Sequence, residues 1–306
     1  MDRLEAMSML LAAVEQGSLS AAARFLHVPV PTLTRKVGEL EERLGTKLLT
    51  RTTRKLILTD AGEAYVGSAR RILDLVAEQE REAGGEFLVP RGELVVTSSL
   101  MFGRLHVLPQ ILEFLSLFPE INVNLVQSDR NLDLVDARVD LAVRLGKLPD
   151  SGLIATRVGS VRIVVCASPA FLLEHGTPRV PDDLAGAPCV LFNGPLVSPD
   201  WRFRVPGSPG SFHSVAISPR LQVSTPDSAV DAAVRNVGFT QLLHYHVAEG
   251  LDAGRLQLVL QEHEVEPIPV HLVHVSRNLM PLKLRRFIDF VAPRLRQSLA
   301  RFSHPG

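Results

Sequence analysis

The sequence predicts an α/β protein with a small helical N-terminal domain, one long connecting helix and a larger C-terminal domain of two lobes. Three observations lead to this prediction. The 306 residues exceed the roughly 250–300 at which a single hydrophobic core stops growing. The N-terminal residues show helical periodicity, and the residues after the connecting helix alternate between strand-like and helical runs. We therefore expect domains at residues 1–59, 60–89 and 90–306.

The composition is that of a folded globular protein, with 46% hydrophobic and 22% charged residues. Its two cysteines, Cys166 and Cys189, are too few for a disulfide framework and lack the C-x-x-C spacing. Acidic Asp2 and Glu5 stand where a signal peptide needs basic residues, and no apolar run is long enough to span a bilayer. These observations predict a cytoplasmic protein without a membrane partner.

The formal net charge is zero, but the charges are unevenly distributed. Residues 1–59 contain nine of the 33 Lys and Arg but only six of the 33 Asp and Glu. Lys47, Arg51, Arg54 and Lys55 lie within nine residues that contain no carboxylate. This cluster indicates an anionic partner for the N-terminal domain or a solvated face.

Two helices are predicted first along the chain. Apolar residues at helical spacing in residues 4–14 are followed by Gly17, which suits a C-terminal helix cap. Ser18 or Ser20 can then cap a second helix that ends at Leu26. Its three consecutive alanines allow another helix to cross it closely.

A third helix is predicted at Thr32–Leu44, after a turn at His27 and Val28. Its apolar face contains Leu33, Val37, Leu40 and Leu44. Its polar face presents Thr32, Thr34, Arg35, Lys36 and Glu39, of which the first four are candidate DNA contacts. Short polar groups and cations on such a helix can reach phosphates and base edges in a major groove. We therefore predict that this is a recognition helix.

Gly45 ends the third helix, and two short strands at residues 48–50 and 56–58 are predicted around a basic turn. A turn of this kind holds a duplex through backbone or minor-groove contacts, here from Arg51, Thr53, Arg54 and Lys55. The order of these elements predicts a winged helix-turn-helix that binds double-stranded DNA. The alternative is an ordinary three-helix core whose charges are solvated.

Five motifs relate this region to a known family: residues 17–23 (GSLSAAA), 34–37 (TRKV), 40–45 (LEERLG), 51–54 (RTTR) and 58–62 (LTDAG). Through them the sequence resembles the LysR-type bacterial transcription regulators. The resemblance implies an operator as DNA partner, and through it we count Ser18, Ser20, Pro29, Val30 and Pro31 among the contacts. Pro29, Val30 and Pro31 stand where the family usually has Ser-Gln-Ser. Reading of a base by the Gln is lost, and Val30 is expected to contact a thymine methyl instead.

The connecting helix is predicted from Thr59 to Glu82, with a hinge at Gly84, Gly85 and Pro90. Ala61, Tyr65, Ser68, Ile72, Leu75 and Gln79 follow alternating steps of four and three residues. This spacing keeps one seam facing a partner helix, so Tyr65, Ile72 and Leu75 are expected in a dimer interface. The alternative is a helix packed on its own domain. The resemblance implies a homodimer or homotetramer that places two reading heads on one operator.

Beyond the hinge, alternating runs predict α/β units with parallel strand pairing. The first group of runs is 94–98, 105–118, 123–127, 132–137, 141–144 and 163–167. The second is 189–192, 215–217, 221–224, 228–236 and 239–243, followed by 270–275 and a final helix at 282–302. The region resembles the periplasmic-binding-protein-like effector domain of the same family. That resemblance implies lobe I at 90–163 and 267–306, and lobe II at 164–266.

In two-lobed α/β folds the ligand lies at the carboxyl ends of strands, where helix N-termini offer free amides. The expected effector contacts are Ser98, Ser99, Met101, Phe102, Ser128, Arg144 and Thr225. Adjacent hydroxyls at a helix start, with Arg144 as counter-charge, predict a small anionic effector. Alternatively, Ser99 only caps its helix and Arg144 pairs with Asp140 or Asp129.

Two other classes of protein fit the sequence less well. An enzyme is not indicated, because the chain contains no G-x-S-x-G, P-loop, H-E-x-x-H or Rossmann glycine motif. His244 with His246, and His271 with His274, lack further ligands at metal-binding spacing, so we expect no metal and no cofactor. A transport-type binding protein would need export and no DNA-binding head. RNA polymerase is an expected further partner where the chain activates transcription.

Overall fold

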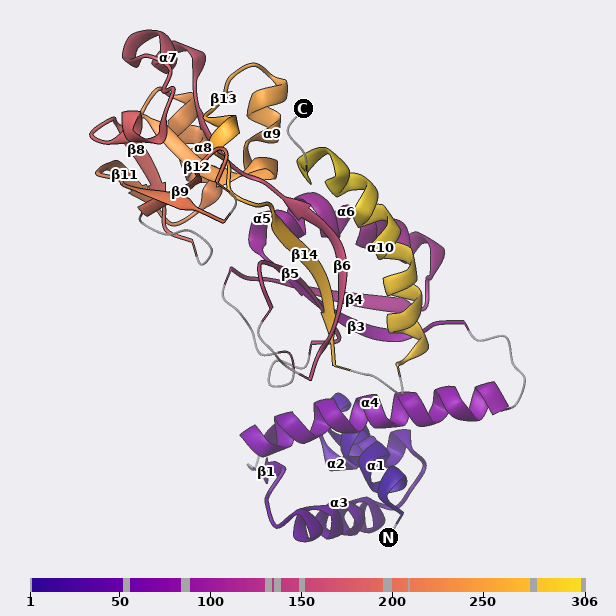
Figure 1. The fold of residues 1–306 in the computed structure, drawn as a ribbon. Helices are drawn as coiled ribbons and strands as arrows, with labels where there is room; N and C mark the ends of the chain where they lie inside the picture. The colour runs from indigo at the N-terminus through magenta and orange to yellow at the C-terminus, as the bar shows by residue number, and fades with distance from the viewer. Residues whose placement is uncertain are drawn as a thin grey trace. The chain divides into compact units, whose positions relative to one another are not determined.

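The computed structural model describes residues 2–51, 56–83, 89–129, 134, 139–148, 152–194, 200–208, 210–275 and 280–303, without the side chains of 51, 78, 79 and 81–83. The chain forms two compact units (Figure 1). One comprises Met1–Gly92 with Asn278–Lys283, and the other comprises Glu93–Arg277 with Leu284–Gly306.

The N-terminal unit is a helical domain with a small hairpin. Its elements are α1 (Arg3–Glu15), α2 (Leu19–Phe25), α3 (Val30–Leu44), β1 (Leu49–Arg51), β2 (Leu56–Leu58) and α4 (Asp60–Ala83). The Asp2 carboxylate caps α1 by accepting the amide of Leu4 at 2.9 Å. Strands β1 and β2 pair antiparallel. The third predicted helix begins two residues earlier than expected, because Pro31 is tolerated in a first helical turn.

The apolar face of α3 packs into the core of this unit. Leu33, Val37 and Leu40 are at most 2% exposed, whereas Leu44 is 40% exposed. Leu44 is the last residue of the helix, and Gly45 follows it in the left-handed conformation at φ +66°. Three of the four residues predicted for the apolar face are therefore buried, and the fourth, Leu44, lies at the exposed end of the helix.

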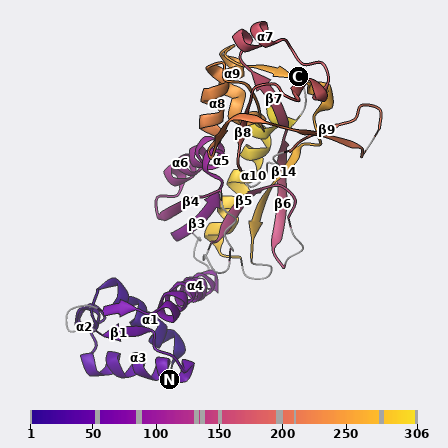
Figure 2. The same cartoon turned by 90° about the vertical axis from the view of Figure 1, so that its left-hand side faces the viewer.

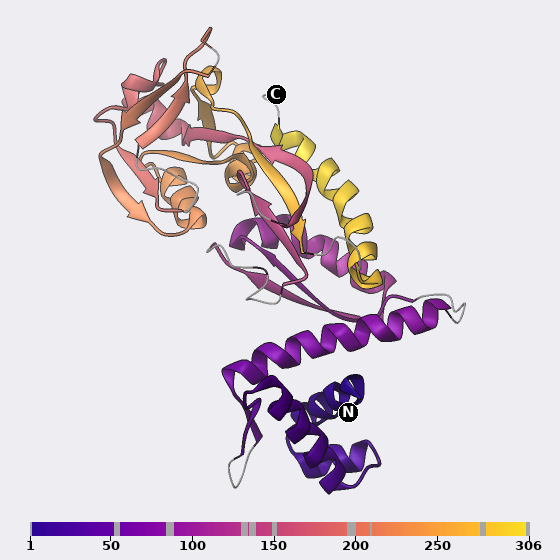
Figure 3. The ribbon, with the colours of Figure 1, turned by 60° about the horizontal axis from the view of Figure 1, so that its bottom comes forward.

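Helix α4 is one uninterrupted helix (Figure 3). Val66 and Ala69 are buried in the same core as α1–α3. Ile72 is 42% exposed and Leu75 is half-buried. One face of α4 is thus packed on its own domain, while another carries exposed apolar side chains.

The C-terminal unit contains two five-stranded sheets. Lobe I has the strand order β4-β3-β5-β14-β6. Its strands are β3 (Gly92–Ser98), β4 (Ile121–Gln127), β5 (Leu141–Leu145), β6 (Ile154–Val161) and β14 (Ile268–His274). Its helices are α5 (Leu100–Phe102), the π-helical turn η1 (Gly103–Val107), α6 (Leu108–Leu117) and α10 (Leu282–Ser303). Helices α6 and α10 lie near each other (Figure 1) and pack through the rings of Phe114 and Phe287, whose centroids are 4.9 Å apart.

Lobe II, in which Figure 2 labels β7 and β8, has the strand order β11-β8-β12-β7-β13. Its strands are β7 (Ile163–Ala167), β8 (Cys189–Phe192), β11 (Pro219–Val223), β12 (Phe239–Leu243) and β13 (Gln257–Val259), with a separate hairpin of β9 (Asp200–Arg204) and β10 (Phe212–Ala216). Its helical elements are α7 (Pro169–His175), η2 (Pro181–Leu184), α8 (Pro226–Val234), α9 (His244–Asp252) and η3 (Gln261–His263). Trp201 and Phe171 are buried in its core.

The expected parallel pairing is correct for only part of these sheets. Strands β3 and β5 pair parallel, as do β8 with β11 and β8 with β12. Strand β14 instead pairs antiparallel with β5 and β6, and β7 pairs antiparallel with β12 and β13. For β6 and β14 the reason is that the chain leaves lobe I along β6 and returns along β14, so these two neighbours run in opposite directions. Most of the run predicted at 132–137 lies outside the described residues.

Candidate nucleic-acid interface and ligand cavity

The turns of the N-terminal unit are set by residues that tolerate left-handed backbone. Gly17 has φ +70° between α1 and α2, and His27 has φ +55° between α2 and α3. The hydroxyl oxygen of Ser18 accepts the amide of Ala21 at 3.1 Å and so caps α2. Ala22 and Ala23 are buried, which allows α3 to cross α2 closely. Ser18 is therefore used in the fold, whereas Ser20 is exposed.

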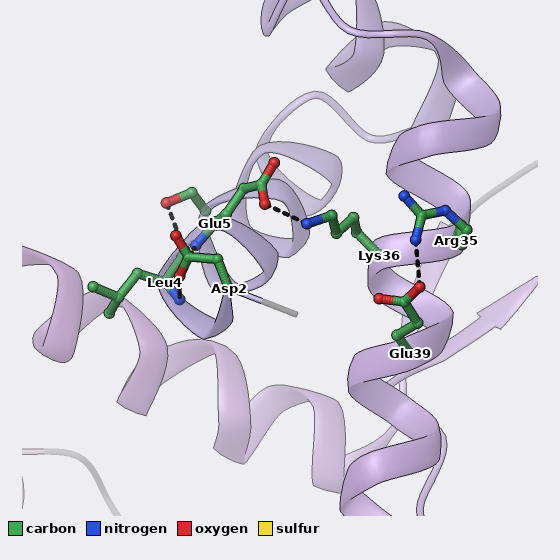
Figure 4. A network of polar contacts seen from close by, with 7 residues as sticks. Asp2, Leu4, Glu5, Arg35, Lys36 and Glu39 are labelled. Carbon is green, nitrogen blue, oxygen red and sulfur yellow. Dashed lines mark hydrogen bonds and ion pairs between the residues drawn. The ribbon is translucent and has the colours of Figure 1, made fainter.

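The start of α3 presents a solvent-facing surface. Pro29, Val30, Pro31 and Arg35 are exposed, and Thr32, Thr34 and Lys36 are half-buried. The Arg35 guanidinium lies 2.5 Å from the Glu39 carboxylate, and the ammonium of Lys36 pairs with Glu5 of α1 (Figure 4). With its side chain 61% exposed, Arg35 can exchange this partner for a phosphate at little cost, because exposed ion pairs contribute little. Lys36 is only 15% exposed and links α3 to α1.

The wing expected from the sequence is partly described. Arg51 ends β1, but its side chain lies outside the described set. Thr53, Arg54 and Lys55 lie wholly outside the described residues. The hairpin that carries them is present as β1 and β2, in the register Leu49 to Leu58.

The expected seam residues of α4 differ in what they pack against. Tyr65 is half-buried and packs against the core of its own domain. Ile72 and Leu75 are not part of that core. Packing on its own domain therefore applies to Tyr65, while Ile72 and Leu75 stay available for the predicted interface.

A cavity of about 530 Å³ lies in the C-terminal unit between the two lobes. Lobe I contributes residues that follow β3 and β4 and residues of β5, and lobe II contributes residues of β12, α9 and the β9–β10 hairpin. Four of the seven residues expected from the sequence line it: Ser99, Met101, Ser128 and Arg144. The cavity thus lies at the strand ends where a ligand is expected in this class of fold.

The other three expected residues are not in the cavity wall. Phe102 is fully buried, with its ring 4.8 Å from that of His106, because the first turn of the helix directs it into the interior. Ser98 is 3% exposed behind the helix start. The hydroxyl of Thr225 donates to that of Ser228 at 2.9 Å and caps α8, so its neighbour Pro226 lines the cavity instead.

Comparison with known proteins gives the family. Residues 4–63 match the model of the bacterial regulatory helix-turn-helix protein, lysR family, and residues 89–296 match the LysR substrate binding domain. The chain belongs to the LysR-type transcriptional regulators. The regulator CrgA of Neisseria meningitidis serogroup B is 34% identical over 96% of this chain and 98% of its own length. The activator AaeR of Escherichia coli is 29% identical over 94% of this chain and 93% of its own.

Solved structures agree over nearly the whole regulator. CrgA from Neisseria meningitidis superposes with a TM-score of 0.60 at 33% identity and covers 95% of this chain and 98% of its own. Full-length AphB of Vibrio cholerae gives a TM-score of 0.59 at 27% identity, with 94% and 98% covered. The protein is therefore a DNA-binding transcriptional regulator with a C-terminal effector-binding domain, and its relatives are regulators rather than enzymes. No helix in the described part of the chain combines the length and apolar character needed to cross a membrane.

The cavity between the lobes is lined by charges of both signs. Arg144, Lys147 and Arg202 line it together with Asp129, Asp200 and Glu266. Burial lowers the pKa of Arg144, so its charge is partly desolvated. Asp129 Oδ1 accepts the amide of Leu100 at 3.1 Å. One of the helix-start amides that the sequence analysis assigned to the effector is therefore occupied by a carboxylate of the chain itself.

Tyr245 and His246 are cavity residues that the sequence analysis missed. Burial raises the pKa of Tyr245, and the nearby Ser99 hydroxyl and Asp129 charge make smaller contributions of opposite sign to each other. Burial, with a smaller contribution from His106, lowers the pKa of His246 to about 3, so its ring is neutral near pH 7. The Ser99 hydroxyl and His246 Nδ1 are buried without hydrogen-bond partners among the described residues. No three His, Cys, Asp or Glu side chains gather as a metal site in the described part of the chain.

Glu41 belongs to the family motif at residues 40–45, but the sequence did not indicate what its side chain does. Its side chain is 8% exposed and its oxygens accept Lys47 Nζ at 2.7 Å and the Leu48 amide at 2.9 Å. Burial acts to raise its pKa, but the bonds from Lys47 and from the Leu49 and Leu48 amides outweigh this, and the pKa lies below its ordinary value. Glu41 therefore remains a carboxylate at neutral pH.

Proposed function

We propose that this regulator binds its operator with the exposed start of α3 and the wing, and that a small anionic effector between the lobes modulates the binding. The contacts proposed on α2 and α3 are Ser20, Pro29, Val30, Pro31, Thr32, Thr34 and Arg35, with Ser18 and Lys36 supporting them, and those on the wing are Arg51, Thr53, Arg54 and Lys55. The observation that carries the proposal is the exposed surface at the start of α3 in a matched lysR-family helix-turn-helix. The domain limits proposed for this function are 1–59, 60–89 and 90–306.

The DNA contact is tested with Arg35→Ala and, as a control on the same helix, Glu42→Ala. Arg35→Ala should weaken operator binding and flatten the dependence of log K on log salt, by about 0.9 for each phosphate that the variant no longer neutralises. Glu42 is exposed and should leave both quantities unchanged. Parent-like affinity of a folded Arg35→Ala protein across the salt series would remove α3 Arg35 from the interface.

We propose that the regulator is a homodimer or homotetramer in which α4 pairs with α4 of a second copy. Ile72, at 42% exposure, and half-buried Leu75 support this interface. Replacing both by Lys should lower the mass measured by light scattering. The matched control replaces exposed Glu63 and Glu80 of the same helix by Lys. An unchanged mass of the folded Ile72→Lys, Leu75→Lys protein would place the interface elsewhere.

The effector is proposed to have its negative end near Ser99 and Arg144 and its apolar part against Met101. Partly desolvated Arg144 supports an anion, because a cation in the cavity wall is stabilised by an opposite charge. Asp129 moves the expected position of that charge away from the Leu100 amide and towards Arg144. A ligand that prefers one lobe arrangement shifts DNA binding by its difference in affinity between the two arrangements.

Calorimetry with a panel of small carboxylates tests this site. A binder should lose affinity in Ser99→Ala and in Arg144→Gln, and keep it in the control Ser116→Ala on the exposed part of α6. Equal affinity in Ser99→Ala, Arg144→Gln and parent would place the ligand elsewhere. We assign the regulator to the cytoplasm, where its DNA lies, and RNA polymerase as its partner at promoters that it activates.

A further inference from the structure

We propose that Glu41 is a positioning residue for DNA binding, because its carboxylate fixes the hairpin β1–β2 to the end of α3. This inference rests on the proposed contact between the wing and DNA. It assigns a role to a residue that itself faces the protein interior rather than the duplex.

The first step is the geometry around the carboxylate. Glu41 Oε1 accepts the amide of Leu48 at 2.9 Å and that of Leu49 at 3.1 Å, and Oε2 accepts Lys47 Nζ at 2.7 Å. Leu48 and Leu49 are 0% and 6% exposed. Two buried amides at the start of β1 therefore have a side chain of α3 as their acceptor, and removal of that acceptor would leave them unsatisfied.

The second step is the contact made by the carbonyl group of Leu48, which belongs to the same peptide as the Leu49 amide. The carbonyl of Leu48 accepts the amide of Thr59 at 3.1 Å, and the Thr59 hydroxyl donates to the carbonyl of Lys47 at 2.7 Å. A Cβ on Gly62 would lie 2.0 Å from the Leu48 carbonyl oxygen, so only glycine allows α4 to approach this closely. The Leu48 residue is thus held by α3 through its N–H and by the start of α4 through its C=O.

The third step is the weakness of the hairpin by itself. In the described part of the hairpin, strands β1 and β2 share three registered pairs, Leu49 with Leu58, Thr50 with Ile57 and Arg51 with Leu56. An isolated two-stranded hairpin is marginally stable in water. The orientation of the hairpin relative to α3 is therefore set where β1 begins. There the Leu48 and Leu49 amides both donate to the Glu41 carboxylate, and these directional bonds fix an orientation that apolar packing alone would not fix.

The test compares Glu41→Leu, which removes the acceptor of the two amides, with Glu42→Leu at the next residue of the same helix, where the side chain is exposed. Operator binding is measured across a salt series, and hydroxyl-radical footprints report backbone protection. Glu41→Leu should flatten the slope of log K against log salt by about 0.9 for each phosphate that the wing no longer neutralises. Its footprint should lack the protection given by the wing and keep the protection given by α3. Glu42→Leu should match the parent.

Arg54→Ala tests the wing contact separately from the role of Glu41. If Arg54→Ala flattens the slope and folded Glu41→Leu keeps the parent slope and footprint, the positioning role is refuted. If Arg54→Ala leaves the slope unchanged, the proposed wing contact is wrong, and the proposed role of Glu41 is wrong with it. If circular dichroism shows that Glu41→Leu is unfolded, Thr59→Val tests the same junction from α4: selective loss of wing protection supports the proposal, and the parent pattern overturns it.

Discussion

Removing the Glu264 carboxylate should destabilise the effector-binding domain strongly. Arg162 Nε and Nη2 each donate to one Glu264 oxygen at 2.6 Å, and the two side chains are 3% and 10% exposed. Arg162 joins β6 to β7, and Glu264 lies between η3 and β14. The ion pair therefore connects the two places where the chain passes between the lobes. In Glu264→Leu the guanidinium stays buried without its carboxylate.

The size of the effect follows from burial. Breaking a buried ion pair by removing one partner costs about 3–5 kcal/mol, because an uncompensated charge remains. For a domain of this size, that decrease corresponds to a Tm lower by about 6–20 °C. Adding Arg162→Met to Glu264→Leu removes the stranded charge, and the double variant should recover most of the stability that the single variant lacks.

Urea denaturation followed by tryptophan fluorescence measures this directly. Trp201 is the single tryptophan of the chain and is 1% exposed in the core of lobe II. The control is Glu249→Leu, which breaks an exposed pair with Arg255 and should cost less than about 1 kcal/mol. A decrease below about 1 kcal/mol in Glu264→Leu, or a double variant as unstable as the single one, would refute the reasoning.

Three further predictions concern single contacts. Gly62→Ala should lower the free energy of unfolding of the N-terminal domain by about 1–3 kcal/mol through overpacking against Leu48, although alanine favours helix; a thermal melt at or above the parent Tm would contradict this. Folding lowers the pKa of Glu41, so the ionised carboxylate stabilises the folded state fully when the pH is above the ordinary pKa of 4.5. This stabilisation is lost as the pH falls below 4.5, and in an acid denaturation series the parent should therefore lose its stability advantage over Glu41→Gln. The exposed pair of Arg104 and Asp227, 3.1 Å apart across the two lobes, should show a coupling below about 1 kcal/mol in a double-mutant cycle.

The N-terminal domain could be predicted well because its signals are local. Gly17 and Gly45 mark helix ends, and both adopt positive φ. The burial of Leu33 follows from its spacing with the next apolar residues of α3. The role of Glu41 was not predicted because the Leu48 and Leu49 amides that it accepts are backbone groups, which no pattern of side chains in the sequence indicates.

The C-terminal domain could be predicted only in outline. Helix α9 follows β12 directly from Leu243 to His244, without a turn residue to mark the change, so Tyr245 and His246 were missed as cavity residues. Strand β9 did carry a signal, since Trp201 and Phe203 are buried between exposed neighbours in a period of two. Phe102 was expected to line the cavity, but its ring is buried in the protein interior. The strand-to-helix junction predicts the position of a residue in the fold, but it does not predict the direction of its side chain.

The position of β14 has a consequence for how the protein is made. Lobe II is continuous in sequence, whereas lobe I receives β14, which lies between β5 and β6, and helix α10 only from the C-terminal residues. On the ribosome, β5 and β6 therefore emerge long before the strand that pairs with both, and their hydrogen-bonding edges stay open until then. Lobe II completes its sheet first and lobe I last. A nascent chain stopped before Ile268 would carry a finished second lobe and a first lobe whose sheet lacks the strand between β5 and β6.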